Sequence, residues 1–111
     1  MNDISKLAGL LGMAKRAGRL IIGFDACVAA VRNGESNILL LASDSSPKTQ
    51  KECRFCADSH HAAVAVLPMD KSAISASIGS HKPVAVAAVT DEGFARAIRS
   101  HCSETKEETS L

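Results

Sequence analysis

One short run of apolar residues constrains the fold of this chain more than any other feature. The segment Asn37–Ala42 (NILLLA) has no polar residue after its first position, so it lacks the alternation of a strand with one solvent-facing side. A run of this length and composition is typical of a strand whose two faces are both covered. It predicts an α/β fold in which helices pack on both sides of a sheet.

Three further short apolar runs predict the remaining strands of this sheet. They lie at Arg19–Ile22, Ala63–Leu67 and Val84–Val89. Pro68 directly follows the third strand in chain order and ends it, because proline cannot continue the backbone hydrogen bonds of a sheet interior. The pattern leaves the order of the strands in the sheet open.

Helical patterns separate the strands. The first predicted helix runs from Asp3 to about Ala17, where Gly18 stops it. Its expected buried stripe is Ile4, Leu7, Ala8, Leu11 and Ala14. The residues expected on its opposite side include Gly9, Gly12 and Arg16. This helix therefore has one face that can cover the sheet.

The other four helices carry clear start or stop signals. The second begins at Gly23 and ends at Asn33-Gly34, and the third begins at Ser46-Pro47 and runs to about Ser59. Asp70 caps a fourth helix, which ends at Gly79 after Ile78, and Asp91 caps a fifth. The strict alternation of helices and strands predicts a three-layer α-β-α sandwich.

The composition bounds the domain and its core. The chain has 111 residues, of which 46% are hydrophobic, so we expect one domain over residues 1–102 and a polar, disordered tail at Ser103–Leu111. Tryptophan and tyrosine are absent, and Phe24, Phe55 and Phe94 are the only aromatic residues. The core must be aliphatic, and so few rings argue against an aromatic surface for stacking the bases of single-stranded nucleic acid.

The net charge and the N-terminal sequence help to predict where in the cell the protein is found. The net charge is +1, but the acidic tail masks a mildly basic body, since the first 34 residues carry five basic and two acidic residues. No apolar stretch is long enough to span a bilayer, and the N-terminus lacks the pattern of a secretory signal. We therefore expect a cytoplasmic protein with reduced cysteines and no membrane partner.

Several local strings resemble one known superfamily. They are Leu10–Leu20 (LLGMAKRAGRL), Gly23–Gly34 (GFDACVAAVRNG), Leu39–Asp44 with Ser46–Lys51, and Val84–Ile98 (VAVAAVTDEGFARAI). In order and spacing they are similar to the kink-turn RNA-binding ribosomal proteins of L-seven-Ae and L-thirty-e type. The bacterial YlxQ-like branch is the most similar branch, and the resemblance extends from Ile4 to Ser100.

The resemblance implies a central four-stranded mixed sheet and a non-enzymatic protein that binds structured, kink-turn-like RNA, including ribosomal RNA. Gly23 matches the family glycine that lets the backbone approach the RNA, and Arg19 matches a nearby basic position. Asp25 stands where asparagine is common, and the loop after the third strand would contact a flipped-out nucleotide. The expected RNA-binding residues are Lys15, Arg16, Arg19, Gly23, Phe24, Asp25, Leu67, Pro68 and Met69.

The chain departs from the family pattern at several positions. Ala26 replaces an acidic or amide residue, Ala29 replaces a lysine, and Ile74-Ser75 replaces a Leu-Gly pair. Asp25 accepts hydrogen bonds but cannot donate them as an asparagine amide can. These losses leave a second hypothesis open, in which the same fold is a protein-interaction module with weakened affinity for RNA.

Two clusters have competing interpretations. Lys15, Arg16 and Arg19 either contact phosphates or complement the dipole at the end of the first helix. Cys53 and Cys56 form a CxxC pair with His60 and His61 close by, which suggests a metal or redox site.

The spacing of the two cysteines on one face of a predicted helix instead favours core positions. The histidines have no acid or nucleophile at a recognisable spacing. We therefore expect no cofactor, no metal, no small-molecule substrate and no catalytic activity.

Overall fold

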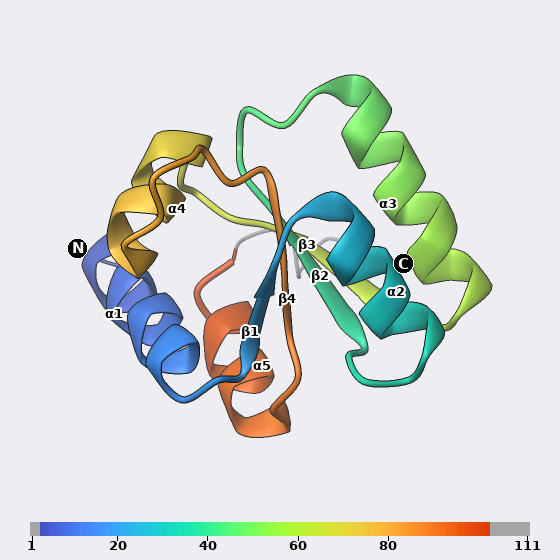
Figure 1. The fold of residues 1–111 in the computed structure, drawn as a ribbon, viewed down its shortest axis with the longest axis horizontal. Coiled ribbons are helices and arrows are strands. Elements are labelled where there is room, and N and C mark those ends of the chain that lie inside the picture. Colours follow the sequence, from blue (N-terminus) through green and yellow to red (C-terminus); the bar gives the residue numbers. More distant parts are fainter. Residues whose placement is uncertain (1–2, 103–111) are drawn as a thin grey trace.

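The alternation predicted from the apolar runs is present in the structure (Figure 1). The computed structural model describes residues 3–102. The elements are α1 (Asp3–Arg16), β1 (Leu20–Ile22), α2 (Phe24–Arg32), β2 (Ile38–Leu41), α3 (Pro47–Ser59), β3 (Ala63–Val66), α4 (Lys71–Ile78), β4 (Val86–Val89) and α5 (Glu92–Arg99). Each predicted element exists, and the boundaries differ by at most a few residues. The predicted tail, Ser103–Leu111, lies outside the described residues.

The four strands form one mixed sheet in the order β1-β4-β2-β3. β2 and β3 are parallel, with Leu39 beside Val64, whereas β4 is antiparallel to both of its neighbours, β1 and β2. The two central strands, β2 and β4, are buried at every position. The prediction that NILLLA is covered on both faces is therefore confirmed.

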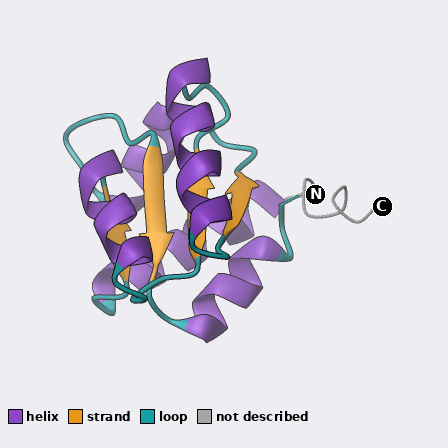
Figure 2. Ribbon diagram, turned by 90° about the vertical axis from the view of Figure 1, so that its right-hand side faces the viewer, coloured by secondary structure: helices purple, strands orange, loops and turns teal. Residues whose placement is uncertain are grey.

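Helices cover both faces of the sheet, as the view in Figure 2 shows. Successive strand residues point to opposite faces. Leu40 of β2 accordingly joins the core under α1, α4 and α5, while Leu39 and Leu41 join the core under α2 and α3. The prediction of a three-layer sandwich is confirmed, and the apolar run at β2 is explained by the two cores that it serves.

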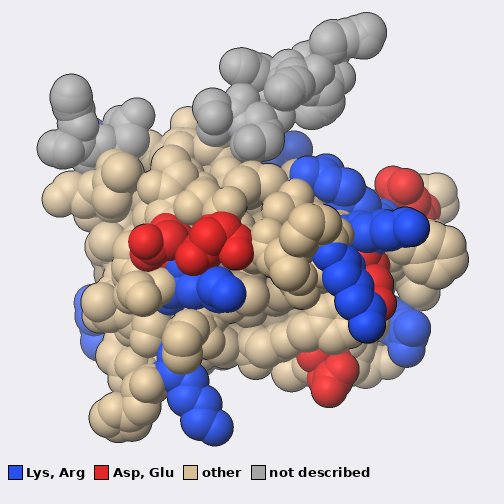
Figure 3. All heavy atoms as spheres, turned by 90° about the horizontal axis from the view of Figure 1, so that it is seen from above, with Lys and Arg blue, Asp and Glu red and all other residues tan. Residues whose placement is uncertain are grey.

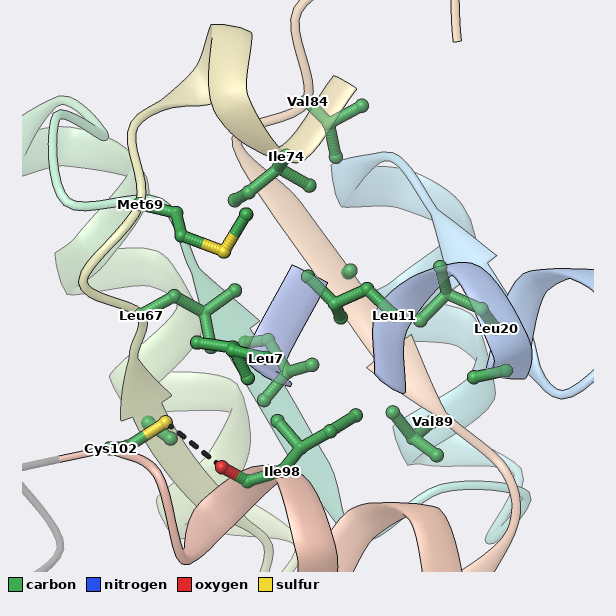
Figure 4. Packing of buried hydrophobic residues seen from close by; sticks show 14 of the residues in the cluster. Leu7, Leu11, Leu20, Leu67, Met69, Ile74, Val84, Val89, Ile98 and Cys102 are labelled. Atoms are coloured by element: carbon green, nitrogen blue, oxygen red, sulfur yellow. Dashed lines mark hydrogen bonds between the residues drawn. The ribbon is translucent and has the colours of Figure 1, made fainter. Parts of the chain in front are cut away.

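The larger core is aliphatic (Figure 4). Leu7 and Leu11 of α1, Ile74 of α4 and Ile98 of α5 are each no more than 1% exposed and point into it. At the border of this core, the Cys102 thiol donates a hydrogen bond to the Ile98 carbonyl oxygen at 3.4 Å. Burying side chains of this size contributes about 1.5–3 kcal/mol each.

No helix among residues 3–102 is long and apolar enough to cross a bilayer.

The packing of α1 corrects the predicted stripe at two positions. Leu7, Leu11 and Ala14 are buried as expected, but Ile4 is 51% exposed. Gly12, expected on the opposite side, is buried against α4. A Cβ atom at Gly12 would lie 3.1 Å from the Ser77 carbonyl oxygen, so glycine allows α1 and α4 to approach closely. The stripe is thus rotated by the contact with α4, which the pattern of α1 alone does not contain.

Candidate functional site

Gly23 forms the turn between β1 and α2. Its φ is +102°, in a region that residues with a Cβ atom rarely adopt. The Gly23 N–H donates to the Val86 carbonyl oxygen at 3.0 Å, which ties the turn to the beginning of β4. Apart from Gly23 and its two chain neighbours, no residue has a heavy atom within 4 Å of the position that a Cβ atom would occupy. The glycine is therefore required by the backbone, and the space in front of it is open.

The first turn of α2 lacks a side-chain cap. In contrast, Ser46 accepts a hydrogen bond from the Thr49 N–H, Asp70 from the Ala73 N–H and Asp91 from the Phe94 N–H. These three caps confirm the helix starts that the sequence predicts at α3, α4 and α5. The first N–H groups of a helix have no partner within the helix. At α2 they are left for solvent or for an external acceptor such as a phosphate oxygen.

Hydrogen bonds gather four loops around this turn, at the end of the sheet where β1, β2 and β3 stop and β4 begins. The Ala42 N–H donates to the Ala85 carbonyl oxygen at 2.9 Å, and the Ser43 N–H donates to the Met69 carbonyl oxygen at 2.9 Å. The Ser45 hydroxyl also donates to the Ala85 carbonyl oxygen, at 3.0 Å. We call this region, comprising residues 23–25, 42–48, 67–71 and 80–85, the Gly23 end.

Several lysines lie on or beside the Gly23 end. Lys48 in the first turn of α3, Lys51 one turn later and Lys82 in the loop before β4 are exposed. Figure 3 looks down on this end and shows Lys and Arg side chains gathered on the side of α3, which carries Lys48, Lys51 and Arg54. The acidic residues here are partly engaged, because Asp44 accepts from the Lys71 N–H at 2.9 Å and Asp70 caps α4. The basic side of this end is therefore the side of α2 and α3.

The structure divides the loop after β3 between core and surface. Leu67 is fully buried and Met69 is 4% exposed, and both side chains point into the larger core (Figure 4). Pro68 is exposed. The expectation that all three side chains contact RNA therefore has to be narrowed to Pro68 and the loop backbone. The adjacent positions of α2 remain accessible, since Asp25 is exposed and Phe24 is half-buried.

The predicted basic cluster lies at the other end of the sheet. The Thr90 N–H donates to the Arg19 carbonyl oxygen at 2.9 Å, so Arg19 lies beside the end of β4, whereas Gly23 lies beside its beginning. Lys15 and Arg16 occupy the last turn of α1 and are exposed. The three-residue strand β1 lies between Arg19 and the Gly23 turn, so their backbones are about 13 Å apart along the extended segment (Figure 1 shows β1). We call their location the Arg19 end.

Sequence reasoning missed Lys48, Lys51 and Lys82 as candidates for this site. They are far from Gly23 along the chain and join it only because β4 pairs with both β1 and β2. One signal was available at Lys48, which follows the predicted Ser46-Pro47 helix start and so stands at a positive helix end. Placing Lys82 requires the strand order, which the pattern did not provide.

A groove of about 860 Å³ lies between α2 and α3. Its apolar lining is Phe24, Val28, Ala29, Phe55 and Cys56. Lys48, Lys51 and Arg32 stand around it, with Asp25 and Glu52 as the acidic residues. The groove begins at the first turns of the two helices, which makes it continuous with the Gly23 end.

The cysteines under this groove behave as core residues. Cys53 is fully buried and Cys56 is 6% exposed, which confirms the interpretation of the CxxC pair as part of the core. Burial raises the pKa of the Cys27 thiol to about 12, and Cys53 adds to the effect. Burial, followed by the neighbouring Cys56, raises the pKa of Cys53 to about 11. Both thiols are therefore protonated at neutral pH and poor nucleophiles.

Comparison with known proteins gives a consistent result. The family described as "Ribosomal protein L7Ae/L30e/S12e/Gadd45 family" matches residues 5–99. The chain is 33% identical over 91 residues to the RNA-binding protein YlxQ of Enterococcus faecium, covering 82% of this chain and 85% of that protein. It is also 33% identical over 86 residues to the RNA-binding protein YlxQ of Bacillus subtilis, covering 78% and 84%.

Two solved structures share the fold. A protein of unknown function from Bacillus halodurans superposes with a TM-score of 0.80 at 33% identity, covering 86% of this chain and 95% of that one. A 15.5 kDa RNA-binding protein from Giardia lamblia superposes with a TM-score of 0.73 at 12% identity, covering 91% and 86%. At that identity the second likeness concerns the fold alone.

Proposed function

Because the chain belongs to the ribosomal protein L7Ae/L30e/S12e/Gadd45 family, we propose that it is a non-enzymatic protein that binds structured RNA at the Gly23 end. The two YlxQ relatives are named as RNA-binding proteins, and the match to them spans most of the chain. The RNA that we propose contains a sharply bent, kink-turn-like internal loop. Ribosomal RNA is the proposed source, with the cytoplasm as the place of binding.

The observation that carries this proposal is the uncapped start of α2 behind Gly23. The N–H groups of the first turn have no side-chain acceptor, and the open space in front of Gly23 lets a backbone come close. Helix N-termini bind phosphate because these N–H groups point outward and the helix dipole is positive there. A bent RNA backbone presents closely spaced phosphates that fit such a site.

The residues around Gly23 supply the remaining parts of an RNA interface. Lys48 lines the same groove as Phe24 and Asp25, and Lys82 is exposed in the loop that leads into β4, so both would pair with phosphates of the bent RNA. Asp25 is exposed in the first turn of α2 and acts only as an acceptor, which suits the amino groups of guanines in G·A pairs. Pro68 offers an apolar contact for an unstacked nucleotide. Phosphate contacts position the RNA, whereas Asp25 reads a base edge.

The departures at Ala26 and Ala29 set the expected degree of selectivity. Both positions are exposed on α2, close to Asp25, and neither methyl group can hydrogen-bond to RNA. We therefore expect binding that depends strongly on phosphate contacts and discriminates modestly between RNA shapes. Introducing the missing groups as Ala26→Glu and Ala29→Lys should increase the preference for a kink-turn over a straight duplex.

The test is a titration of the natural protein and of the Ala26→Glu/Ala29→Lys variant against a kink-turn RNA and a duplex of equal length, at two salt concentrations. We expect both proteins to bind the kink-turn more tightly, with the larger preference in the variant. Absence of RNA binding by the natural protein at low salt would overturn the proposed function and favour the protein-interaction module. Strong discrimination by the natural protein would show that Ala26 and Ala29 limit selectivity less than we argue.

Association with ribosomal RNA has its own test. We expect the protein to sediment with ribosomal particles at low salt and to be released at high salt, because the contacts are mostly ionic. Gly23→Ala should reduce the fraction of protein that sediments with the particles. Unchanged sedimentation of that variant would show that a different surface attaches the protein to the particle.

A further inference from the structure

Two of the three aromatic residues in the chain line one groove. Phe24 stands in the first turn of α2, and Phe55 stands in the middle of α3 on the opposite wall. Phe55 is 74% exposed, which makes it the most exposed large hydrophobic residue that the structure describes. Phe55 does not pack in the core, so its apolar ring is exposed to water without stabilising the fold. The ring is free to contact a ligand.

The groove is continuous with the Gly23 end. β1 and β2 both stop at that end, so α2 and α3 both begin there and run away from it in the same direction (Figure 1). Phe24, Asp25 and Lys48 belong both to the Gly23 end and to the groove, while Arg32 lies at the far end of α2. A polynucleotide that leaves the Gly23 end on this side meets the groove directly.

The charge around the groove suits a polyanion with apolar faces. Lys48, Lys51 and Arg32 line it together with Asp25 and Glu52, so cations are in the majority. Within residues 3–102 the one salt bridge joins Arg96 to Glu92 on α5, so the acidic residues of the groove do not neutralise its lysines by direct pairing. An apolar floor with lysines at its rim is the arrangement by which proteins hold single strands, with bases on rings and phosphates on cations.

We propose that the groove between α2 and α3 binds an unpaired RNA segment that extends from the structured RNA at the Gly23 end. A base of this segment stacks on Phe55, and Lys48 and Lys51 contact its phosphates. The proposal rests on the proposed function, since the RNA is the same molecule. It departs from the expectation that so few aromatic rings argue against base stacking, because the fold brings two of them into one groove.

The test compares a kink-turn RNA with the same RNA extended by a short single-stranded oligouridine at either its 5′ or its 3′ end. The variants are Phe55→Ala, Phe55→Tyr and Phe55→Leu, with Met13→Ala as the matched control, because Met13 is also exposed, at 48%, but lies on α1. We expect one of the two extensions to tighten binding to the natural protein by roughly tenfold, the size typical of one base stacked on a ring. Phe55→Ala and Phe55→Leu should lose this gain, while Phe55→Tyr and Met13→Ala keep it.

The outcomes separate this inference from the function itself. If the short RNA binds and neither extension adds affinity, the groove does not hold RNA, while the function at the Gly23 end stands. If Phe55→Leu keeps the full gain, the contact is general hydrophobic docking of the kind that a protein partner makes, and the stacking proposal is overturned. If no RNA binds at all, both proposals fail together. Ultraviolet crosslinking of an iodouridine in the extension to Phe55 would confirm the placement, and a crosslink confined to other helices would contradict it.

Discussion

The two ends of the sheet both carry exposed cations, but most of the helices around them present opposite poles. At the Gly23 end, α2, α3 and α4 begin, so their positive dipole ends point outward. At the Arg19 end, α1, α2 and α3 finish, and their negative ends point outward, while α5 also begins there with its first turn capped by Asp91. Equal side-chain charge therefore has different consequences at the two ends.

At the Arg19 end we expect Lys15 and Arg16 to stabilise the fold. Lys15 and Arg16 occupy the last turn of α1, where a positive charge contributes about 0.3–1 kcal/mol at a negative helix end. No RNA is needed to explain them. At the Gly23 end, Lys48 stands in the first turn of α3, which contains no acidic residue, so its charge opposes the dipole. A bound anion offsets both the Lys48 charge and the positive end of the α3 dipole. This is why we assign the RNA to the Gly23 end.

The largest effect that we predict separates core from surface within the loop after β3. Leu67→Ala removes a fully buried side chain and should lower the free energy of unfolding by about 2–5 kcal/mol. Pro68→Ala, at the exposed neighbouring position, should change the free energy of unfolding by less than about 0.5 kcal/mol. Chemical denaturation measures both changes. A stable Leu67→Ala variant with weakened RNA binding would show that Leu67 contacts RNA, which contradicts its assignment to the core.

The second prediction uses a pair of glycines, one at each end. Gly23 and Gly18 both have positive φ, of +102° and +74°, and at neither would an added Cβ atom have a neighbouring atom within 4 Å. Alanine at either position should cost about 1–3 kcal/mol of stability through backbone strain. Only Gly23→Ala should also weaken RNA binding, by roughly tenfold or more, because its Cβ atom occupies the space that the RNA backbone approaches.

Binding is measured at a temperature where both glycine variants remain folded, which circular dichroism verifies. Equal losses of affinity in Gly18→Ala and Gly23→Ala would show that the two ends do not differ in the way we propose.

The smallest predicted effect is a change in the free energy of unfolding that has opposite signs at the two ends. Lys48→Glu should raise the free energy of unfolding by about 0.3–1 kcal/mol, because it places a negative charge at the positive end of α3. Lys15→Glu should lower the free energy of unfolding by a similar amount at the negative end of α1. Thermal unfolding at low ionic strength is the measurement, and added salt should shrink both changes. Changes of the same sign would contradict the dipole argument.

Much of the fold was predictable from local patterns. The positions of the elements follow from signals between neighbouring residues. These are the apolar run at β2, the caps at Ser46, Asp70 and Asp91, and the stop at Gly79. Strand order was not predictable, since it depends on pairing between distant segments. The exposure of Ile4 likewise follows from how α1 packs in three dimensions.

The site was predicted less completely than the fold for the same reason. Gly23 and Asp25 are neighbours in sequence, so the resemblance of the second helix to the family was sufficient to select them as candidates. Arg19 is close to Gly23 along the chain, yet an intervening strand carries it to the opposite end. Lys82 is distant in sequence, yet it lies in the loop that leads into β4, whose first residue, Val86, accepts a hydrogen bond from the Gly23 N–H.

The most direct test of the central claim removes equal charge from the two ends in turn. One variant carries Lys48→Ala, Lys51→Ala and Lys82→Ala, and the other carries Lys15→Ala, Arg16→Ala and Arg19→Ala. Each is titrated with a kink-turn RNA over a range of salt concentrations. We predict that the first variant binds more weakly and that the slope of log K against log salt falls by about 2–3, whereas the second keeps the slope of the natural protein within about 1. The reverse result, a reduced slope only when the Arg19 end is neutralised, would contradict the assignment of RNA to the Gly23 end.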